Sequence, residues 1–173
     1  MNVLALDLSL TGTGWATPEA TGTLVPPAKV GKGVDRLRWI RDEVLVLAWP
    51  VPDLIAIEGA AFGQARGSSR LHALGELSGV VRVALHELGV PVVDVAPAVV
   101  KRLATGKGNA PKEAVLVAAV RRLSFEGHSP DAADARWILE AVAQHYGLPW
   151  RATLPAAHLV KLDASVQWPE LDR

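Results

Sequence analysis

The order of short apolar runs and helical repeats limits the fold of this sequence more than any other feature. Apolar segments of strand length occur at residues 2–7, 14–16, 23–25, 53–58 and 91–95. Between and after them, apolar residues return every three or four positions, as one face of a helix requires. Three strands first, followed by alternating helices and strands, predict an α/β fold with a mixed five-stranded sheet flanked by helices.

Turn and cap residues mark where several of these helices begin and end. Apolar residues recur over 37–47 and 74–88, and Gly89 marks the end of the second helix. Shorter helices are expected at 99–103 and from Pro111 to about residue 123, and Ser129 followed by Pro130 is typical of a helix start. That last helix should end near residue 146. We therefore expect one domain over residues 1–146 and a C-terminal extension, 147–173, in which no periodic pattern is visible.

Composition excludes several classes of site. The chain has 173 residues, 18 basic and 18 acidic side chains, and no cysteine. Disulfides, zinc–thiolate sites and thiol nucleophiles are therefore excluded, and any metal must bind oxygen or imidazole. No apolar run approaches the ~18 residues of a membrane span, and no basic segment precedes the first carboxylate, so we expect neither a transmembrane helix nor a signal peptide. The expected location is therefore the cytoplasm.

Two carboxylates stand where a ligand site is expected. Asp7 and Glu58 each end an apolar strand. Open α/β folds bind their ligands at the carboxyl ends of strands, and a buried carboxylate is costly unless it is paired or coordinated. The alternative interpretation of either acid alone is that it simply caps its strand at the protein surface.

A second pair of acids opens the last helix. Asp131 and Asp134 lie one turn before Ala135 and Ile138, so they extend the apolar stripe of that helix. Stabilisation by the helix dipole is the alternative explanation. Magnesium and manganese prefer oxygen ligands, and four acids around two ions would form a two-metal phosphodiester site.

The four acids and their neighbours resemble the RuvC family of Holliday-junction resolvases, within the ribonuclease H-like nucleases. Residues 4–7, 55–58 and 131–134 read LALD, IAIE and DAAD, in the order of that family's first strand, fourth strand and last helix. The resemblance covers residues 1 to about 146. It implies a ribonuclease H-like fold and a metal-dependent endodeoxyribonuclease that resolves four-way DNA junctions by paired symmetric nicks.

The resemblance also implies a role for each acid. Asp7 should bridge two Mg²⁺ or Mn²⁺ ions. Glu58 and Asp134 should each hold one ion, and Asp131 should complete the cluster.

Basic residues gather locally although the whole chain is neutral. Residues 99–122 hold six basic side chains and one acid, and phosphate contacts supply most sequence-independent affinity for DNA. The expected phosphate contacts are Arg66, Arg70, Lys101, Lys107 and Lys112. Lys107 lies between two glycines that would let the backbone approach a phosphate. Phe62 either stacks on a base at the crossover or packs in the core.

Two-fold symmetry of a four-way junction favours a homodimer with two sites. Gly75 and Gly79 each cost a helix ~1 kcal/mol relative to alanine, and close helix packing in a dimer or within the monomer would explain them. Leu8 and Ser9 stand where cellular members carry Pro-Gly, and the loop 104–112 looks like that of phage resolvases. We therefore expect the phage-like branch, which leaves partnership with a cellular branch-migration motor open.

Three other functions compete with this interpretation. A nuclease of the same fold could act on other branched DNA, such as flaps, or on RNA–DNA hybrids. Actin-like and sugar-kinase domains also begin with an Asp followed by Gly and Thr, but they need two such domains, and this chain is too short. A catalytically inert junction-binding module is disfavoured because all four acids are present.

Overall fold

A mixed sheet lies at the centre of the computed structural model, which describes residues 1–59 and 69–171. The strands are β1 (Val3–Asp7), β2 (Thr13–Ala16), β3 (Thr21–Leu24), β4 (Leu54–Glu58) and β5 (Val92–Val95). They form a five-stranded sheet in the order β3-β2-β1-β4-β5. β1 pairs antiparallel with β2 and parallel with β4, and β4 pairs parallel with β5. The predicted mixed five-stranded sheet is confirmed.

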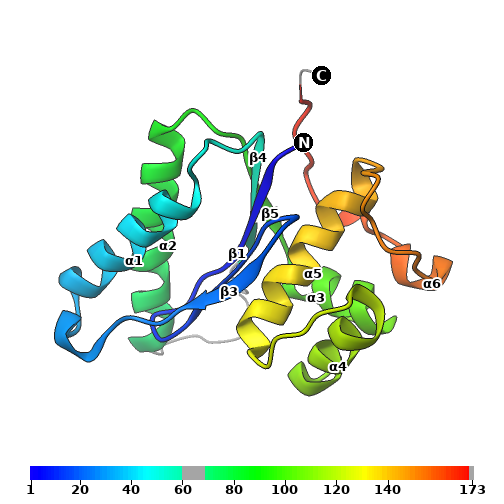
Figure 1. The fold of residues 1–173 in the computed structure, drawn as a ribbon, viewed down its shortest axis with the longest axis horizontal. Helices are drawn as coiled ribbons and strands as arrows, with labels where there is room; N and C mark the ends of the chain where they lie inside the picture. The colour runs from blue at the N-terminus through cyan, green and yellow to red at the C-terminus, as the bar shows by residue number, and fades with distance from the viewer. Residues whose placement is uncertain (60–68, 172–173) are drawn as a thin grey trace.

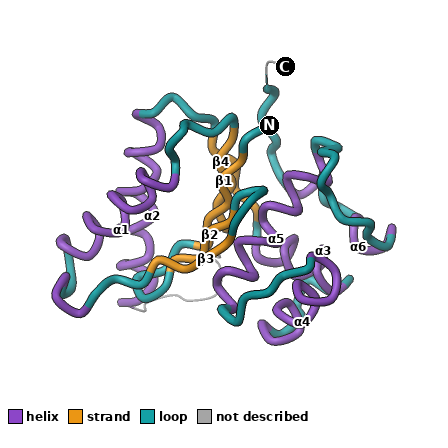
Figure 2. Tube along the Cα trace, viewed as in Figure 1, coloured by secondary structure: helices purple, strands orange, loops and turns teal. Residues whose placement is uncertain are grey.

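Helices cover both faces of the sheet (Figures 1 and 2). One face carries α1 (Val34–Leu47) and α2 (Ser69–Glu87), and the other carries α3 (Pro97–Thr105), α4 (Lys112–Leu123) and α5 (Pro130–His145). Three short elements complete the described fold: η1 (Ala28–Val30), α6 (Ala156–Leu159) and η2 (Asp163–Ser165). In the part of the chain that the structure describes, no helix combines the length and the apolar character that crossing a membrane needs.

Alternation along the central strands decides which way the acids point. In β1, Val3 and Ala5 belong to the core under α5, whereas Leu4 and Leu6 belong to the core under α1 and α2. Successive side chains of a strand point to opposite faces. Asp7 therefore follows Val3 and Ala5 toward α5, and the same alternation in β4 turns Glu58 that way.

Small residues let α5 lie close to the sheet. The strand positions that face it include Ala5, Ala16 and Ala56, all fully buried. Gly14, opposite Asp7 in β2, is the tightest point, because a Cβ there would overlap the backbone carbonyl of Asp131. A glycine in β2 is thus what brings the first turn of α5 beside the end of β1.

Helix ends agree with the sequence in most places. Ser129 caps α5, its Oγ accepts a hydrogen bond from the Ala132 N–H, and Pro130 is the first helical residue. Two details differ. Pro111 precedes α4 as its cap residue, and Leu88, expected on the apolar face of α2, is exposed because α2 ends at Glu87.

The C-terminal extension packs back onto the domain. Leu148, Leu162 and Val166 are buried in the same core as α5. The fully buried carboxylate of Glu140 also joins the extension to α5, accepting a hydrogen bond from the Ala152 N–H at 2.8 Å. The residues of the extension that make these contacts lie outside regular helices and strands. The sequence therefore shows no periodic pattern that would predict them. The boundary at residue 146 stays a prediction.

Candidate active site

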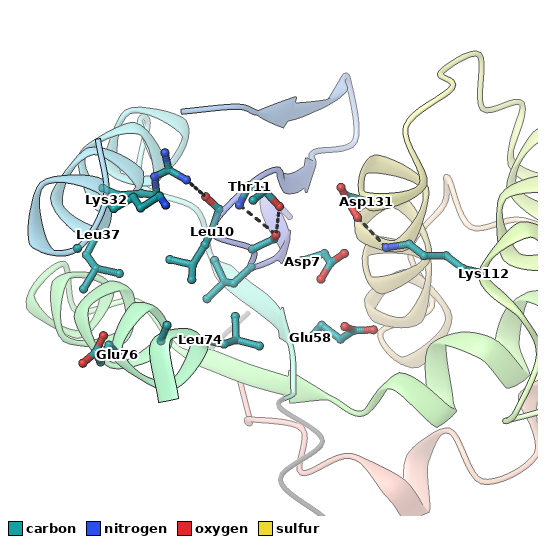
Figure 3. Close-up of a pocket in the computed structure, with 15 residues that line it drawn as sticks. Asp7, Leu10, Thr11, Lys32, Leu37, Glu58, Leu74, Glu76, Lys112 and Asp131 are labelled. Carbon is teal, nitrogen blue, oxygen red and sulfur yellow. Dashed lines mark hydrogen bonds and ion pairs between the residues drawn. The ribbon is translucent and has the colours of Figure 1, made fainter. Parts of the chain in front are cut away.

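The two strand-end acids meet at one edge of the sheet. β1 and β4 pair in parallel, with Leu6 opposite Ile57, so the next residues, Asp7 and Glu58, end neighbouring strands. The two carboxyl groups lie close enough for the charge of Glu58 to raise the pKa of Asp7. Asp7 is only 8% exposed. Figure 3 shows both side chains turned toward the start of α5.

The first turn of α5 brings Asp131 and Asp134 to the same edge. β3 helps to hold this turn, because the hydroxyl of Thr23 donates to Ser129 Oγ at 2.8 Å. Just before β2, a Cβ at Gly12 would lie 3.2 Å from Asp131 Oδ2, so the carboxylate sits directly over that glycine. Four predicted acids from β1, β4 and α5 therefore form one group, called here the acidic cluster.

Lys112, the first residue of α4, lies within this cluster. Its Nζ is 2.6 Å from Asp131 Oδ1 and 3.2 Å from Asp134 Oδ2. The sequence placed this lysine among the expected phosphate contacts. The fold adds a contact that the sequence spacing did not reveal, because residues 19 positions apart meet only where α4 packs against α5.

Burial and mutual repulsion raise the pKa values of Asp7, Glu58 and Asp134. The pKa of Glu58 rises from its ordinary value of 4.5 to about 7, mainly through burial and then through the charge of Asp134. Burial, followed by the charges of Glu58 and Asp134, raises the pKa of Asp7 well above its usual range. Burial also raises the pKa of Asp134, with Lys112 opposing it. In the described structure these four carboxyl groups contact one ammonium, that of Lys112, so their fully ionised form carries excess negative charge, and the raised pKa values reflect its cost.

The chemistry of the donors suits a divalent cation. Carboxylate oxygens are the ligands that Mg²⁺ and Mn²⁺ prefer, and the excess negative charge favours a cation. Within residues 1–59 and 69–171, no three acidic or histidine side chains already stand close enough together to hold an ion. The Lys112 ammonium, placed between the two acids of α5, supplies positive charge there instead.

A cavity of ≈ 670 Å³ extends from the acidic cluster toward α1. Asp7, Glu58, Lys112 and Asp131 line one end, and Lys32 lies at the other (Figure 3); Arg36 of α1 also lines the cavity. Sequence reasoning missed these two cations. They lie at the start of a helix on the opposite face of the sheet from α5, and no spacing relates them to the acids.

The other predicted DNA-contacting lysines differ in how far they are buried. Lys101 is half-buried, and its charge lowers the pKa values of Glu58 and Asp134, so it stands near the cluster. Lys107 is exposed. Contacts within the fold explain the two glycines beside Lys107, which are Gly106 and Gly108.

Gly106 ends α3 with a φ of 81° and packs against His158. At Gly108, an added Cβ would lie 3.1 Å from the carbonyl oxygen of Ala98. Phe62 and Arg66 fall outside the described residues, as does the side chain of Arg70.

Gly75 and Gly79 on α2 have no close neighbour in the described parts of the chain, since a Cβ at either would meet nothing within 4 Å. Packing among the described residues therefore does not explain them.

Comparison with known proteins places this chain in one family. Residues 20–143 match the family model of the crossover junction endodeoxyribonuclease RuvC, a range that holds three of the four acids. RuvC from Synechococcus sp. (strain WH7803) is 33% identical over 147 residues, covering 78% of this chain and 93% of the relative. RuvC from Sorangium cellulosum is 36% identical over 146 residues, covering 78% and 80%.

Solved structures agree with the sequence matches. Thermus thermophilus RuvC in complex with a Holliday junction substrate superposes with a TM-score of 0.69 and 25% identity, covering 85% of this chain and 96% of that one. This match confirms the predicted ribonuclease H-like fold. Whether the chain belongs to the phage-like branch stays a prediction. The family model and the extensive bacterial matches show that this chain belongs to the RuvC family, and it is accordingly a metal-dependent crossover junction endodeoxyribonuclease.

Proposed function

We propose that this chain resolves four-way DNA junctions by hydrolysing one phosphodiester bond on each of two opposing strands. The observation that carries the proposal is the acidic cluster, in which carboxylates from β1, β4 and α5 meet at one edge of the sheet. The burial and raised pKa values of Asp7, Glu58 and Asp134 are unfavourable in a purely structural role. Such a cluster of carboxylates is stabilised where cations bind beside a phosphate.

Asp7, Glu58, Asp131 and Asp134 are the proposed catalytic residues, and we assign them to two Mg²⁺ or Mn²⁺ ions. Asp7 would contact both ions, Glu58 and Asp134 one each, with Asp131 completing the set. When bound, such ions lower the pKa of a water molecule and offset the charge that develops on the phosphate. The chain's own contribution is to hold the four carboxylates at one rigid edge, where β2 and β3 fix the start of α5.

Basic residues around the cluster are proposed to hold the DNA. Lys112 is suited to contact the phosphate that is cut, because its ammonium already reaches two of the acids. Lys101 stands near the same acids, and Lys107 is exposed beyond it. Arg66, Arg70 and Phe62 stay sequence-based candidates in the segment after Glu58, with Phe62 either stacking on a base or packing in the core.

A homodimer would present two acidic clusters to the two-fold symmetric junction. The open surface over Gly75 and Gly79 supports α2 as part of the interface. A cellular branch-migration motor stays an open question for this chain.

Cleavage of a labelled synthetic four-way junction with Mg²⁺ or Mn²⁺ tests the function. The panel includes duplex, flap and RNA–DNA hybrid controls. Paired symmetric nicks that leave religatable ends, and that EDTA abolishes, are the expected result. Cleavage of flaps or hybrids without cleavage of the junction would overturn junction resolution and favour the alternative nuclease function.

The Asp7→Asn variant tests the site. We expect this variant to lose junction cleavage while its junction affinity stays close to that of the wild type, because the change removes a charge at the reacting centre without removing a basic contact. Gel-based cleavage and fluorescence anisotropy measure the two quantities. Asp42→Asn, which alters an exposed acid paired with Arg41 on α1, is the matched control and should cut normally. Loss of binding together with cleavage would show that Asp7 is structural.

A further inference from the structure

The cavity beside the acidic cluster has a second charged end to which the proposed function gives no role. Lys32 and Arg36, called here the α1 cation pair, line that end. Leu10 and Leu74 line the walls between the pair and the acids (Figure 3). One continuous space of ≈ 670 Å³ therefore connects two cations with the acidic cluster.

Arg36 has donors that the described fold leaves unused. One terminal N–H of its guanidinium donates to the Leu10 carbonyl at 3.4 Å, while its Nε is buried without a hydrogen-bond partner among residues 1–59 and 69–171. A guanidinium carries five N–H donors in a fixed fork, and a buried donor without an acceptor is destabilising. The free donor favours an anionic ligand with several acceptor oxygens.

Neither member of the pair has a carboxylate partner. In the described parts of the chain, no ion pair involves Lys32 or Arg36. Glu76 also lines the cavity, from α2, but it is exposed and pairs with neither cation there. The positive charge at this end of the cavity is therefore available to a ligand.

The backbone between the two cations is open as well. Gly33 lines the cavity and precedes α1, and an added Cβ there would meet nothing within 4 Å in the described structure. No side chain caps the first turn of this 14-residue helix. Helix starts favour anions because their first N–H groups lack intrahelical partners, so the backbone adds to the effect of the cation pair.

We propose that Lys32 and Arg36 bind a phosphate of the substrate strand that neighbours the phosphate being cut. The inference rests on the proposed function, since it needs a nucleic-acid strand at the acidic cluster. A strand that crosses the cavity would place one phosphate at the acids and a neighbouring phosphate at the α1 cation pair. The pair would then fix the position of the strand along the site, as positioning residues that touch no reacting atom.

A phosphate-by-phosphate experiment tests this subsite. Four-way junctions are made with a single neutral methylphosphonate at successive positions on either side of the cut, and their affinities are measured by anisotropy in EDTA. One neighbouring position should weaken binding by the wild type. The Lys32→Gln/Arg36→Gln variant should bind the unmodified junction more weakly and show no further weakening at that position. Such non-additivity identifies a direct contact.

Salt dependence gives a second readout. The double variant should show a smaller slope of log affinity against log salt, by about one for each phosphate that it no longer neutralises. Lys29→Gln removes an exposed charge from η1, away from the cavity, and should keep both the slope and the wild-type response to each methylphosphonate. Because Arg36→Gln also removes the hydrogen bond to Leu10, Lys32→Gln alone provides a variant that leaves this bond intact.

The outcomes separate this inference from the proposed function. The subsite would be overturned if the methylphosphonate and the substitution weaken binding additively at every position, in both the double variant and Lys32→Gln. This holds even if the junction is cut normally. If the wild type cuts only flaps or hybrids, junction resolution fails. The same scan on that substrate then tests the subsite, with non-additivity at one position supporting it and additivity throughout rejecting it.

Discussion

The ammonium of Lys112 lies between the acids of α5, where a divalent cation would compete with it. Its ammonium contacts both acids of α5, at 2.6 and 3.2 Å. Replacement by methionine should tighten binding of Mn²⁺ several-fold, because a unit charge ~4 Å away contributes about 1 kcal/mol even at the dielectric constant of water. Titration calorimetry measures the Kd. Lys107→Met is the control, since this exposed lysine forms no ion pair with the cluster in the described structure. Equal Mn²⁺ affinity for both variants would contradict the competition.

The pKa of Glu58 predicts how the metal-free protein responds to pH. Because folding raises this pKa from 4.5 to about 7, the folded protein retains a proton that the unfolded chain releases. The resulting stabilisation is fully present below about 4.5 and is lost as the pH rises through about 7. In EDTA, the wild type should therefore lose stability across this window relative to Glu58→Gln.

Thermal melts from pH 4.5 to 8 measure that difference. The comparison with Glu58→Gln cancels the contributions of all groups that the two proteins share. Mg²⁺ should raise the Tm of the wild type more at pH 8 than at pH 5, since the ionised carboxylate is the form that binds a cation. A constant Tm difference between the two proteins over the whole range would rule out the raised pKa.

At the scale of elements, the contact between β2 and α5 decides whether the site assembles. An alanine at Gly14 would place its Cβ against the carbonyl oxygen of Asp131, and this backbone atom yields only if the start of α5 moves. We expect Gly14→Ala to lose about 1–3 kcal/mol of stability, as overpacked cores do, and to lose most cleavage. Denaturant unfolding and junction cleavage measure the two effects.

Gly75→Ala is the control for the stability measurement alone, because a Cβ there meets nothing within 4 Å in the described structure. It should leave the monomer folded and gain ~1 kcal/mol of helix propensity. Normal cleavage by Gly14→Ala would mean that the position of α5 tolerates a shift, and the site would then depend less on this contact than we infer.

The sequence predicted these elements well where local chemistry determines them. Apolar runs located β1 and β4, and the Ser129–Pro130 pair located the start of α5, so the four acids were identifiable from their places at element ends. The α1 cation pair and the contact of Lys112 with α5 were not predictable in this way. They depend on how α1 and α4 pack, and no residue spacing records that packing.

At the scale of the whole molecule, the face formed by α1 and α2 is the proposed dimer surface. A groove of ≈ 380 Å³ runs between these helices, lined by Gly79, Val80 and Val83 among others, and Val83 is 59% exposed. Exposed apolar residues beside a glycine on a helix allow a second helix to approach closely. The groove lies toward the C-terminal ends of the two helices, whereas residues nearer their starts line the cavity beside the acidic cluster.

Gly79→Arg should therefore weaken the dimer without unfolding the monomer. The new side chain enters open space in the described structure, but in a dimer it would place a bulky charge at the interface. Sedimentation equilibrium should show a dimer Kd raised at least tenfold, and junction cleavage should change from paired nicks to single, unpaired ones. Val117→Arg, at an exposed valine of α4 on the other side of the sheet, is the matched control. A Gly79→Arg protein that stays dimeric would move the interface away from α2 and leave the two glycines without an explanation.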